Sequence, residues 1–153
     1  MGERLTVVVV SDIHYGGATE KERGWREDDF ISNGALRLAL RAYRHFIWRR
    51  DVFAHNDLLD RFIAKPADAD LVVANGDFSC DTAFIGVADD ASRQSAGKCL
   101  NKLRAHFGSR FHATIGDHEL GKRSLFGGAG GMRLASWRRA TRELELQPFW
   151  KID

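Results

Sequence analysis

Three short apolar runs, each followed at once by acidic or histidine residues, constrain this chain more than any other feature of its sequence. The three polar clusters are Ser11-Asp12-Ile13-His14, Asn75-Gly76-Asp77 and Gly116-Asp117-His118-Glu119. The first run, residues 5–10, is rich in β-branched residues and does not alternate with polar ones, which is typical of a strand buried in a parallel sheet. Because the carboxyl ends of parallel strands meet at one edge of a sheet, we expect the three clusters to lie close together.

Helical patterns separate these strands. We predict strands over residues 5–10, 71–74 and 111–115. Apolar residues recur at helical spacing between and after them, and the predicted helices cover residues 36–47, 57–64, 91–107 and 132–146. The segment 15–33 is long for a loop, so we expect function or short helical turns there. The order β-α-β-α-β with connections of this length predicts an α/β fold with a mainly parallel sheet.

Two of the predicted helices have a recognisable apolar face. In the first, Leu36, Leu40, Tyr43 and Ile47 lie on one side and arginines on the other, which is typical of a helix packed against a core. In the last, the residues expected to face inward are Leu134, Trp137, Thr141 and Leu144.

Composition places the chain among ordinary globular proteins. It has 153 residues, of which 44% are hydrophobic and 29% charged, and its formal net charge is +2. That charge by itself indicates neither a nucleic-acid nor a membrane partner, and no apolar run approaches the roughly 18 residues that a membrane span needs. The two cysteines, Cys80 and Cys99, are too few for a disulfide framework, so we expect reduced thiols and a cytoplasmic protein.

The residue types in the clusters suit metal binding. Asp12 and His14 are two residues apart and can point to one spot, and Asp77 follows a glycine that lets the backbone turn sharply. A carboxylate and a neutral imidazole are suitable ligands for Mn, Fe or Zn. Each motif also has a plainer interpretation: a surface Asp beside a core His, a simple Gly-Asp turn, or Asp117 as a helix cap.

In order, the clusters resemble the first three motifs of the calcineurin-like metallophosphoesterases, which run Asp-x-His, Gly-Asp and Gly-Asn-His-Asp/Glu. The resemblance extends over roughly residues 5 to 150. It implies a four-layer α/β/β/α sandwich, of which this chain is the N-terminal half. It also implies two divalent or trivalent metal ions (Mn, Fe or Zn) and a metal-bridging hydroxide that hydrolyses a phosphate mono- or diester.

By this resemblance, the metal ligands are Asp12, His14, Asp77 and Asp117, with Asp77 shared between the two ions. Asp117 stands where the family has Asn, which adds a negative charge to the second metal site. The catalytic residues implied are His118, which acts on the phosphoryl or leaving-group oxygens, and Glu119, which would orient the ring of His118.

The later histidine motifs of the family do not appear, since no histidine follows His118. The other candidates, His45, His55, His106 and His112, lie at positions typical of surface or packed side chains. We therefore predict one metallophosphoesterase domain over residues 1–153, incomplete at its C-terminus, with an incomplete second metal site and poor activity on its own. A fragmentary sequence, or a second half supplied by another chain, would explain the pattern.

A sheet without its second half would leave one apolar face uncovered, and such faces mark interaction surfaces or aggregation sites. We accordingly expect a C-terminal half or an oligomer to cover it. The predicted function is metal-dependent phosphoester hydrolysis, and the alternative is a non-catalytic binding module with the same fold. Basic residues after the third cluster permit a nucleic-acid contact without supporting one, and we favour a loop and a solvated helix face as their explanation.

Overall fold

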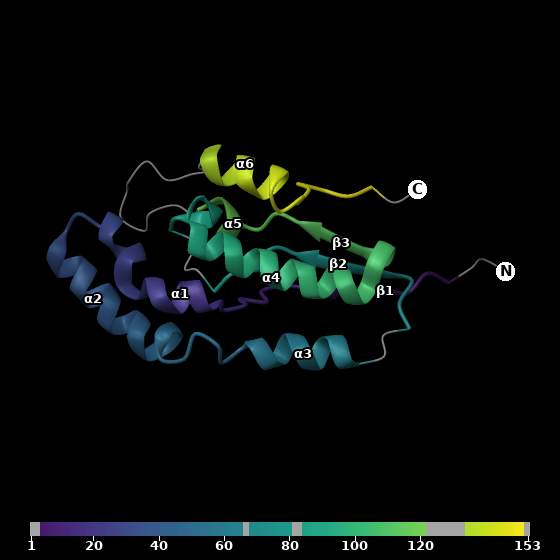
Figure 1. Ribbon diagram of the computed structural model, residues 1–153, viewed down its shortest axis with the longest axis horizontal. Helices are drawn as coiled ribbons and strands as arrows, with labels where there is room; N and C mark the ends of the chain where they lie inside the picture. The colour runs from purple at the N-terminus through teal and green to yellow at the C-terminus, as the bar shows by residue number, and fades with distance from the viewer. Residues whose placement is uncertain (1–3, 66–67, 81–83, 122–133, 152–153) are drawn as a thin grey trace.

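Three parallel strands form the sheet of this protein in its computed structural model, which describes residues 4–65, 68–80, 84–121 and 134–151 (Figure 1). The strands are β1 (Val7–Val10), β2 (Leu71–Asn75) and β3 (Phe111–Thr114), in the spatial order β1-β2-β3. The predicted strands and their parallel arrangement are therefore confirmed. Val10 lies opposite Ala74, and Ala74 opposite Ala113, so all three strands end at the same edge of the sheet.

The segment between β1 and β2 is helical. It contains α1 (Ala18–Arg23), a 3₁₀ segment (Gly24–Phe30), α2 (Gly34–Arg44), a π-helical turn (His45–Arg49) and α3 (Asn56–Ala64). The short helical turns predicted within residues 15–33 are thus present. The side chain of Asn33 accepts the backbone N–H of Leu36 at 3.0 Å, which caps the start of α2.

The longest helix precedes β3. A 3₁₀ turn (Gly86–Ala88) leads into α4 (Asp90–Phe107), and a second 3₁₀ turn (Gly108–Arg110) leads into β3. After β3 come the single-turn helix α5 (Asp117–Leu120) and α6 (Leu134–Arg142). The predicted start of the last helix lies outside the described residues. Its end comes earlier than predicted because the chain turns at Glu145, which has a φ of 54°.

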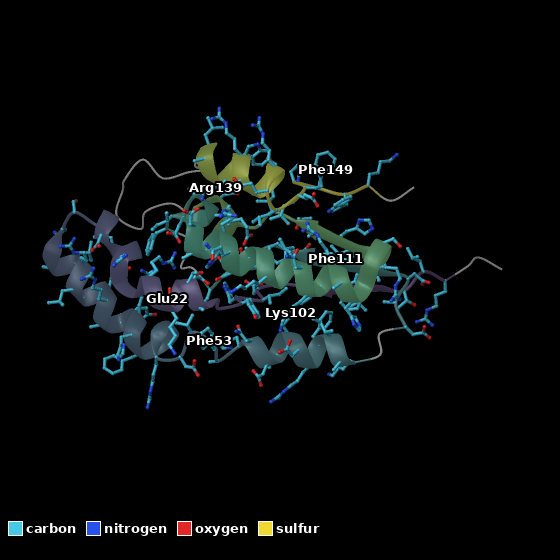
Figure 2. All side chains as sticks on the ribbon, viewed as in Figure 1. Glu22, Phe53, Lys102, Phe111, Arg139 and Phe149 are labelled. Carbon is cyan, nitrogen blue, oxygen red and sulfur yellow. The ribbon has the colours of Figure 1, made fainter. Side chains whose placement is uncertain are left out.

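Helix α4 covers one face of the sheet (Figure 1). It supplies five of the sixteen buried residues of the core cluster. Leu100 and Leu103 are fully buried in a cluster with Val72, Ala74 and Ala113. Each such leucine contributes roughly 1.5–3 kcal/mol through burial. Helix α3 joins the cluster through Leu59 and is tied to α4 by an ion pair of 2.6 Å between Lys102 Nζ and Asp60 (Figure 2).

The opposite face of the sheet carries exposed valines. Val7 is 43% exposed and Val9 is 58% exposed, and none of the residues in the described part of the chain buries them. The uncovered face expected from the sequence is thus observed at β1, whereas Val73 and His112 on the same face of β2 and β3 are half-buried. The described residues contain one sheet, so the expected four-layer sandwich is not seen, and the fold established is an α/β arrangement with a parallel sheet.

The apolar face predicted for α2 turns inward only in part. Tyr43 is 60% exposed, whereas Arg44 is buried and pairs with Asp28, which is itself fully buried. Arg41 pairs with Asp29 at 2.6 Å on the same side of the helix. The preceding 3₁₀ segment places these aspartates beside α2, so Arg44 packs inward. Of the apolar face, Leu36 and Leu40 are half-buried, whereas its C-terminal part is left in solvent.

The last helix follows its predicted pattern only in part. Leu144 is buried, and Trp137 and Thr141 are half-buried, but Leu134 is 61% exposed. Ser136 and Ala140 take the innermost positions because small side chains allow α6 to lie close to the turn at Gly86–Ala88, where Ser136 Oγ accepts the N–H of Ala88 at 3.0 Å.

Two sequence predictions about the chemistry of the chain agree with the structure. Cys80 and Cys99 are free thiols. Across the described ranges, no helix combines the length and the apolar character that crossing a bilayer requires.

Candidate metal centre

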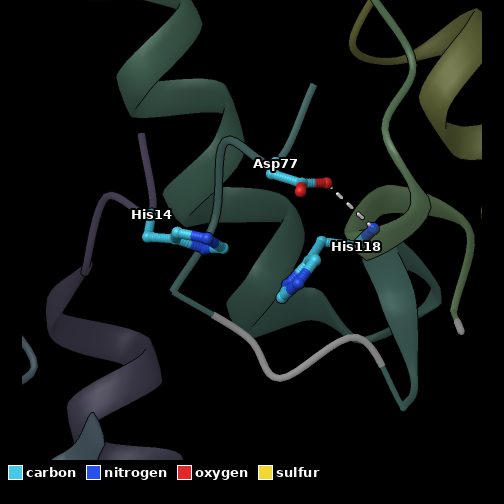
Figure 3. Close-up of side chains that lie close together, drawn as sticks. All are labelled: His14, Asp77 and His118. Carbon is cyan, nitrogen blue, oxygen red and sulfur yellow. Dashed lines mark hydrogen bonds between the residues drawn. The ribbon is translucent and has the colours of Figure 1, made fainter. Parts of the chain in front are cut away.

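The turns that follow the three strands bring three potential metal ligands together. One ligand atom each from His14, Asp77 and His118 lies within 4.8 Å of the other two (Figure 3). These residues come from three different predicted clusters. The spatial convergence that the sequence implied therefore occurs, and it involves one residue from each strand end.

His14 is held in place by its backbone and by its ring. Its N–H donates to the carbonyl of Asp77 at 3.0 Å, and its Nδ1 lies 3.2 Å from the carbonyl oxygen of Ser79. If Nδ1 carries the proton, that contact leaves Nε2 as the atom that can bind a cation. Burial of the ring, followed by the nearby ring of His118, lowers the pKa of His14. A lowered pKa favours the neutral imidazole, which is the form that binds metals.

Asp77 links the second and third turns. Its Oδ1 accepts the backbone N–H of His118 at 3.1 Å (Figure 3). Burial raises the pKa of Asp77, with the positive charge of His118 acting in the opposite direction. A partly buried carboxylate beside two imidazoles is stabilised in its charged form by a bound cation.

The backbone at the site is strained. Among the described residues, the non-glycine residues with positive φ are Asp12, His14, Asp77 and Glu145, with φ of 53°, 48°, 58° and 54°. Three of these four occupy predicted ligand positions. The left-handed conformation costs non-glycine residues about 1–2 kcal/mol, and such strain concentrates at functional sites.

Two glycines allow the second and third turns to approach closely. A Cβ on Gly76, which has a φ of +74°, would lie 2.3 Å from the backbone of Gly116. A Cβ on Gly116 would lie 2.3 Å from Oδ1 of Asp77. The sharp turn predicted at Gly76 is therefore present, and the contact between the two glycines places Asp77 beside the start of α5.

Glu119 supports this contact from inside the protein. Its buried carboxylate accepts the backbone N–H groups of Asp77 and Phe78, both at 2.8 Å, and of Gly116 at 2.9 Å. Both of its oxygens are used in these bonds, whereas the family pattern had assigned it to the ring of His118. Complete burial raises the pKa of Glu119, and the three N–H donors oppose that rise.

Two of the predicted ligands lie at the margin of the group. The side chain of Asp12 is 67% exposed, and one of its oxygens is 3.9 Å from Nε2 of His14. Asp117 is exposed at the first position of α5, and its charge contributes to the raised pKa of Asp77. Neither belongs to the three-residue group formed by His14, Asp77 and His118.

The donor set of that group suits a transition-metal cation. One carboxylate oxygen and two imidazole nitrogens match the ligand preferences of Zn, Mn and Fe, and three protein ligands leave positions open for water or substrate. His45, His55, His106 and His112 lie outside the group, as predicted.

Sequence reasoning missed one feature next to the group. A cavity of about 300 Å³ opens between the end of β1 and α3, and its lining includes Asp12, His14 and His55. No sequence pattern pointed to it, because the cavity depends on how α3 packs beside β1.

This arrangement places a candidate metal-binding site at the carboxyl edge of a parallel sheet. The sequence pattern of the calcineurin-like phosphoesterases matches residues 5–153. The chain therefore belongs to the calcineurin-like phosphoesterase family. Searches of curated proteins and of solved structures find no match to it.

Proposed function

We propose that this protein is a metal-dependent hydrolase of phosphate mono- or diesters. The observation that carries the proposal is the convergence of His14, Asp77 and His118, whose ligand atoms lie within 4.8 Å of one another in a chain of this family. A bound cation would act as a Lewis acid on the phosphoryl oxygens and would supply a hydroxide nucleophile at neutral pH.

Within this proposal, the residues have separate roles. His14 and Asp77 hold the cation, since both are partly buried and fixed by hydrogen bonds to neighbouring turns. His118 contacts the substrate and donates a proton to the leaving oxygen, a role that an imidazole performs near neutral pH. Glu119 positions Asp77 through its backbone N–H.

We further propose that Asp12 and Asp117 add oxygen ligands when two ions are bound, as the family pattern implies. Both carboxylates are exposed near the group, which supports this role. Mn, Fe and Zn are the proposed metals. A cytoplasmic location is proposed as well, and the two free thiols support it.

The test uses the purified protein loaded with Mn²⁺ and a chromogenic phosphodiester. Asp77→Asn keeps the shape of the side chain but removes its charge, and we expect it to lower kcat/KM by roughly 100-fold or more. The matched control is Asp57→Asn, an exposed aspartate on α3 that pairs with Arg61. Equal activity of the Asp77 variant and the wild type would remove the proposed mechanism.

The uncovered sheet face favours a second candidate, a binding module. Val7 and Val9 are exposed on a strand that also has an unpaired edge in the described part of the chain. Apolar faces of this kind are interaction surfaces. We propose that further polypeptide, either an additional segment or a second copy, covers this face. Concentration-dependent association measured by light scattering, without metal-dependent hydrolysis, would favour the binding module over the enzyme.

A further inference from the structure

A cavity of about 300 Å³ lies directly beside the candidate metal centre. It opens between the carboxyl end of β1 and helix α3. Most of its wall is apolar and comes from Val10, Leu58, Leu59 and Phe62. Leu59 is buried, whereas Leu58 is 55% exposed at the mouth. The cavity therefore has a buried apolar side chain in its wall and an exposed one that solvent and ligands can reach.

The cavity is continuous with the metal centre. Asp12 and His14 belong to its lining, and His14 is also one of the three residues that approach one another within 4.8 Å. A phosphate ester with its phosphoryl group at a cation held by His14 would have its organic group next to the opening. Because the cavity shares His14 with the candidate metal centre, it can hold the organic group of a phosphate ester.

The size of the cavity limits what it accepts. About 300 Å³ is at the lower end of the range of ligand pockets, and an apolar cavity of roughly 150 Å³ is large enough for benzene. A single aromatic ring with a linking atom fits this space, whereas a folded peptide segment does not. The valine, leucine and phenylalanine side chains offer contact area but no hydrogen bonds, so they select by shape and apolar character.

The polar part of the lining is at one end. The hydroxyl of Ser11 donates to Asp12, and His55 precedes the first residue of α3. With Asp12 and His14 they make up the polar part of the lining, and the apolar residues form the rest. An amphipathic ligand with an anionic head and an apolar ring matches this division.

We propose that the cavity between β1 and α3 binds a single aromatic ring of a phosphate-ester substrate while the phosphoryl group lies at the metal centre. This inference rests on the proposed function for the placement of the phosphoryl group. It goes beyond it by assigning the substrate class as aryl or arylmethyl phosphate esters and by assigning Leu58, at the mouth, as a specificity-determining residue.

The experiment measures binding instead of turnover. Phenylphosphonate and methylphosphonate are titrated calorimetrically into the Mn²⁺-loaded protein, at a pH where both are dianions. We expect phenylphosphonate to bind at least about tenfold more tightly, since one or two methylene groups in an apolar pocket already give 10–200-fold discrimination. Leu58→Trp fills the mouth of the cavity and is expected to bring the two affinities within about twofold of each other.

The matched control is Leu134→Trp, which changes a leucine of similar exposure on α6, away from the cavity. We expect it to leave the tenfold preference intact. Leu58→Ala serves as a second variant that cannot overfill the site, and it should reduce the preference about threefold or more. Circular dichroism of each variant verifies that its helices are formed.

The outcomes separate this inference from the proposed function. Three results would overturn the assignment of the cavity as a ring-binding site. These are equal binding of the two phosphonates, no binding of either, and a preference for phenylphosphonate that Leu58→Trp leaves unchanged. Hydrolysis of a phosphodiester by the same sample would then leave the proposed function standing. The opposite result is also possible. If the protein prefers phenylphosphonate, loses that preference in Leu58→Trp and hydrolyses no phosphate ester with any metal, the cavity binds an aromatic ring but the proposed hydrolase activity is wrong.

Discussion

The imidazole rings of His14 and His118 lie edge to face, with their centroids 4.7 Å apart. One follows the first strand and the other follows the third, and Asp77 from the turn between them approaches both. Two protonated imidazoles at this separation would repel each other, whereas a neutral ring of His14 can bind a cation beside His118. The pair therefore couples the protonation of the site to its capacity to bind metal.

Removal of either ring should weaken metal binding. We expect His14→Ala and His118→Ala each to raise the Kd for Mn²⁺ by about tenfold or more, measured by calorimetry, because each loses a ligand or a group next to the cation. His106→Ala is the control, since His106 is exposed near the end of α4. Unchanged affinity in the His118 variant would restrict the metal ligands to the first two turns.

Stability of the metal-free protein should depend on pH through His14. Its pKa in the folded protein is lower than the unfolded value of 6.5, chiefly because the ring is buried. The folded state therefore binds the proton less well than the unfolded state, so the contribution of His14 is complete above pH 6.5 and is lost as the pH falls through the lowered pKa.

We expect His14→Gln to reduce this loss of stability, measured as the free energy of unfolding in urea at several pH values below 6.5. The comparison is made between the two proteins because Asp77 and Glu119 have raised pKa values and change stability in the opposite direction. Parallel pH profiles for variant and wild type would contradict the assignment to His14.

The strained backbone at Asp12 predicts a gain in stability on substitution. Asp12 has a φ of 53° and its side chain is 67% exposed, so Asp12→Gly removes strain and few contacts. We expect the free energy of unfolding to rise by about 0.5–1 kcal/mol, after allowance for the greater entropy of glycine in the unfolded chain. Asp12→Ala keeps the strain, so it should show no such gain, and both variants should bind Mn²⁺ more weakly if Asp12 is a ligand.

Glu119 should be difficult to replace. Glu119→Gln puts an NH₂ group where a carboxylate oxygen accepts backbone N–H groups, so at least one buried donor loses its acceptor. We expect a loss of about 1–3 kcal/mol in the free energy of unfolding, even though the change also removes a buried charge. A stabilised Gln variant would mean that the cost of burying the charge exceeds the value of the three hydrogen bonds.

The uncovered sheet face can be tested with a pair of identical substitutions. Val9→Thr changes a valine that is 58% exposed, and Val72→Thr changes one that is fully buried on the covered face of the neighbouring strand. In urea unfolding, we expect Val9→Thr to change the free energy of unfolding by no more than about 0.5 kcal/mol. We expect Val72→Thr to lower it by roughly 1–3 kcal/mol. If a second copy covers the face in solution, Val9→Thr should also reduce self-association, measured by light scattering.

Much of the fold was predictable because it depends on local patterns. The β-branched block at residues 5–10 and the apolar runs before Asn75 and Ile115 have few alternatives to buried parallel strands, and the helical period over residues 91–107 matches α4 closely. The prediction for α2 failed in part because periodicity shows which residues share a face but not which face turns inward. The acidic residues Asp28 and Asp29, which precede α2, decided that.

The sequence by itself determined that three polar clusters would meet, since residues that follow parallel strands are confined to one edge of a sheet. The tertiary structure decided which members of each cluster face one another. The left-handed backbone at His14 and Asp77, and the close contact of Gly76 with Gly116, bring His14, Asp77 and His118 together while Asp12 and Asp117 stay at the margin. The order of strands and helices along the chain follows from local sequence patterns. Side-chain direction at a turn depends on backbone angles and on neighbours distant in sequence, which only packing supplies.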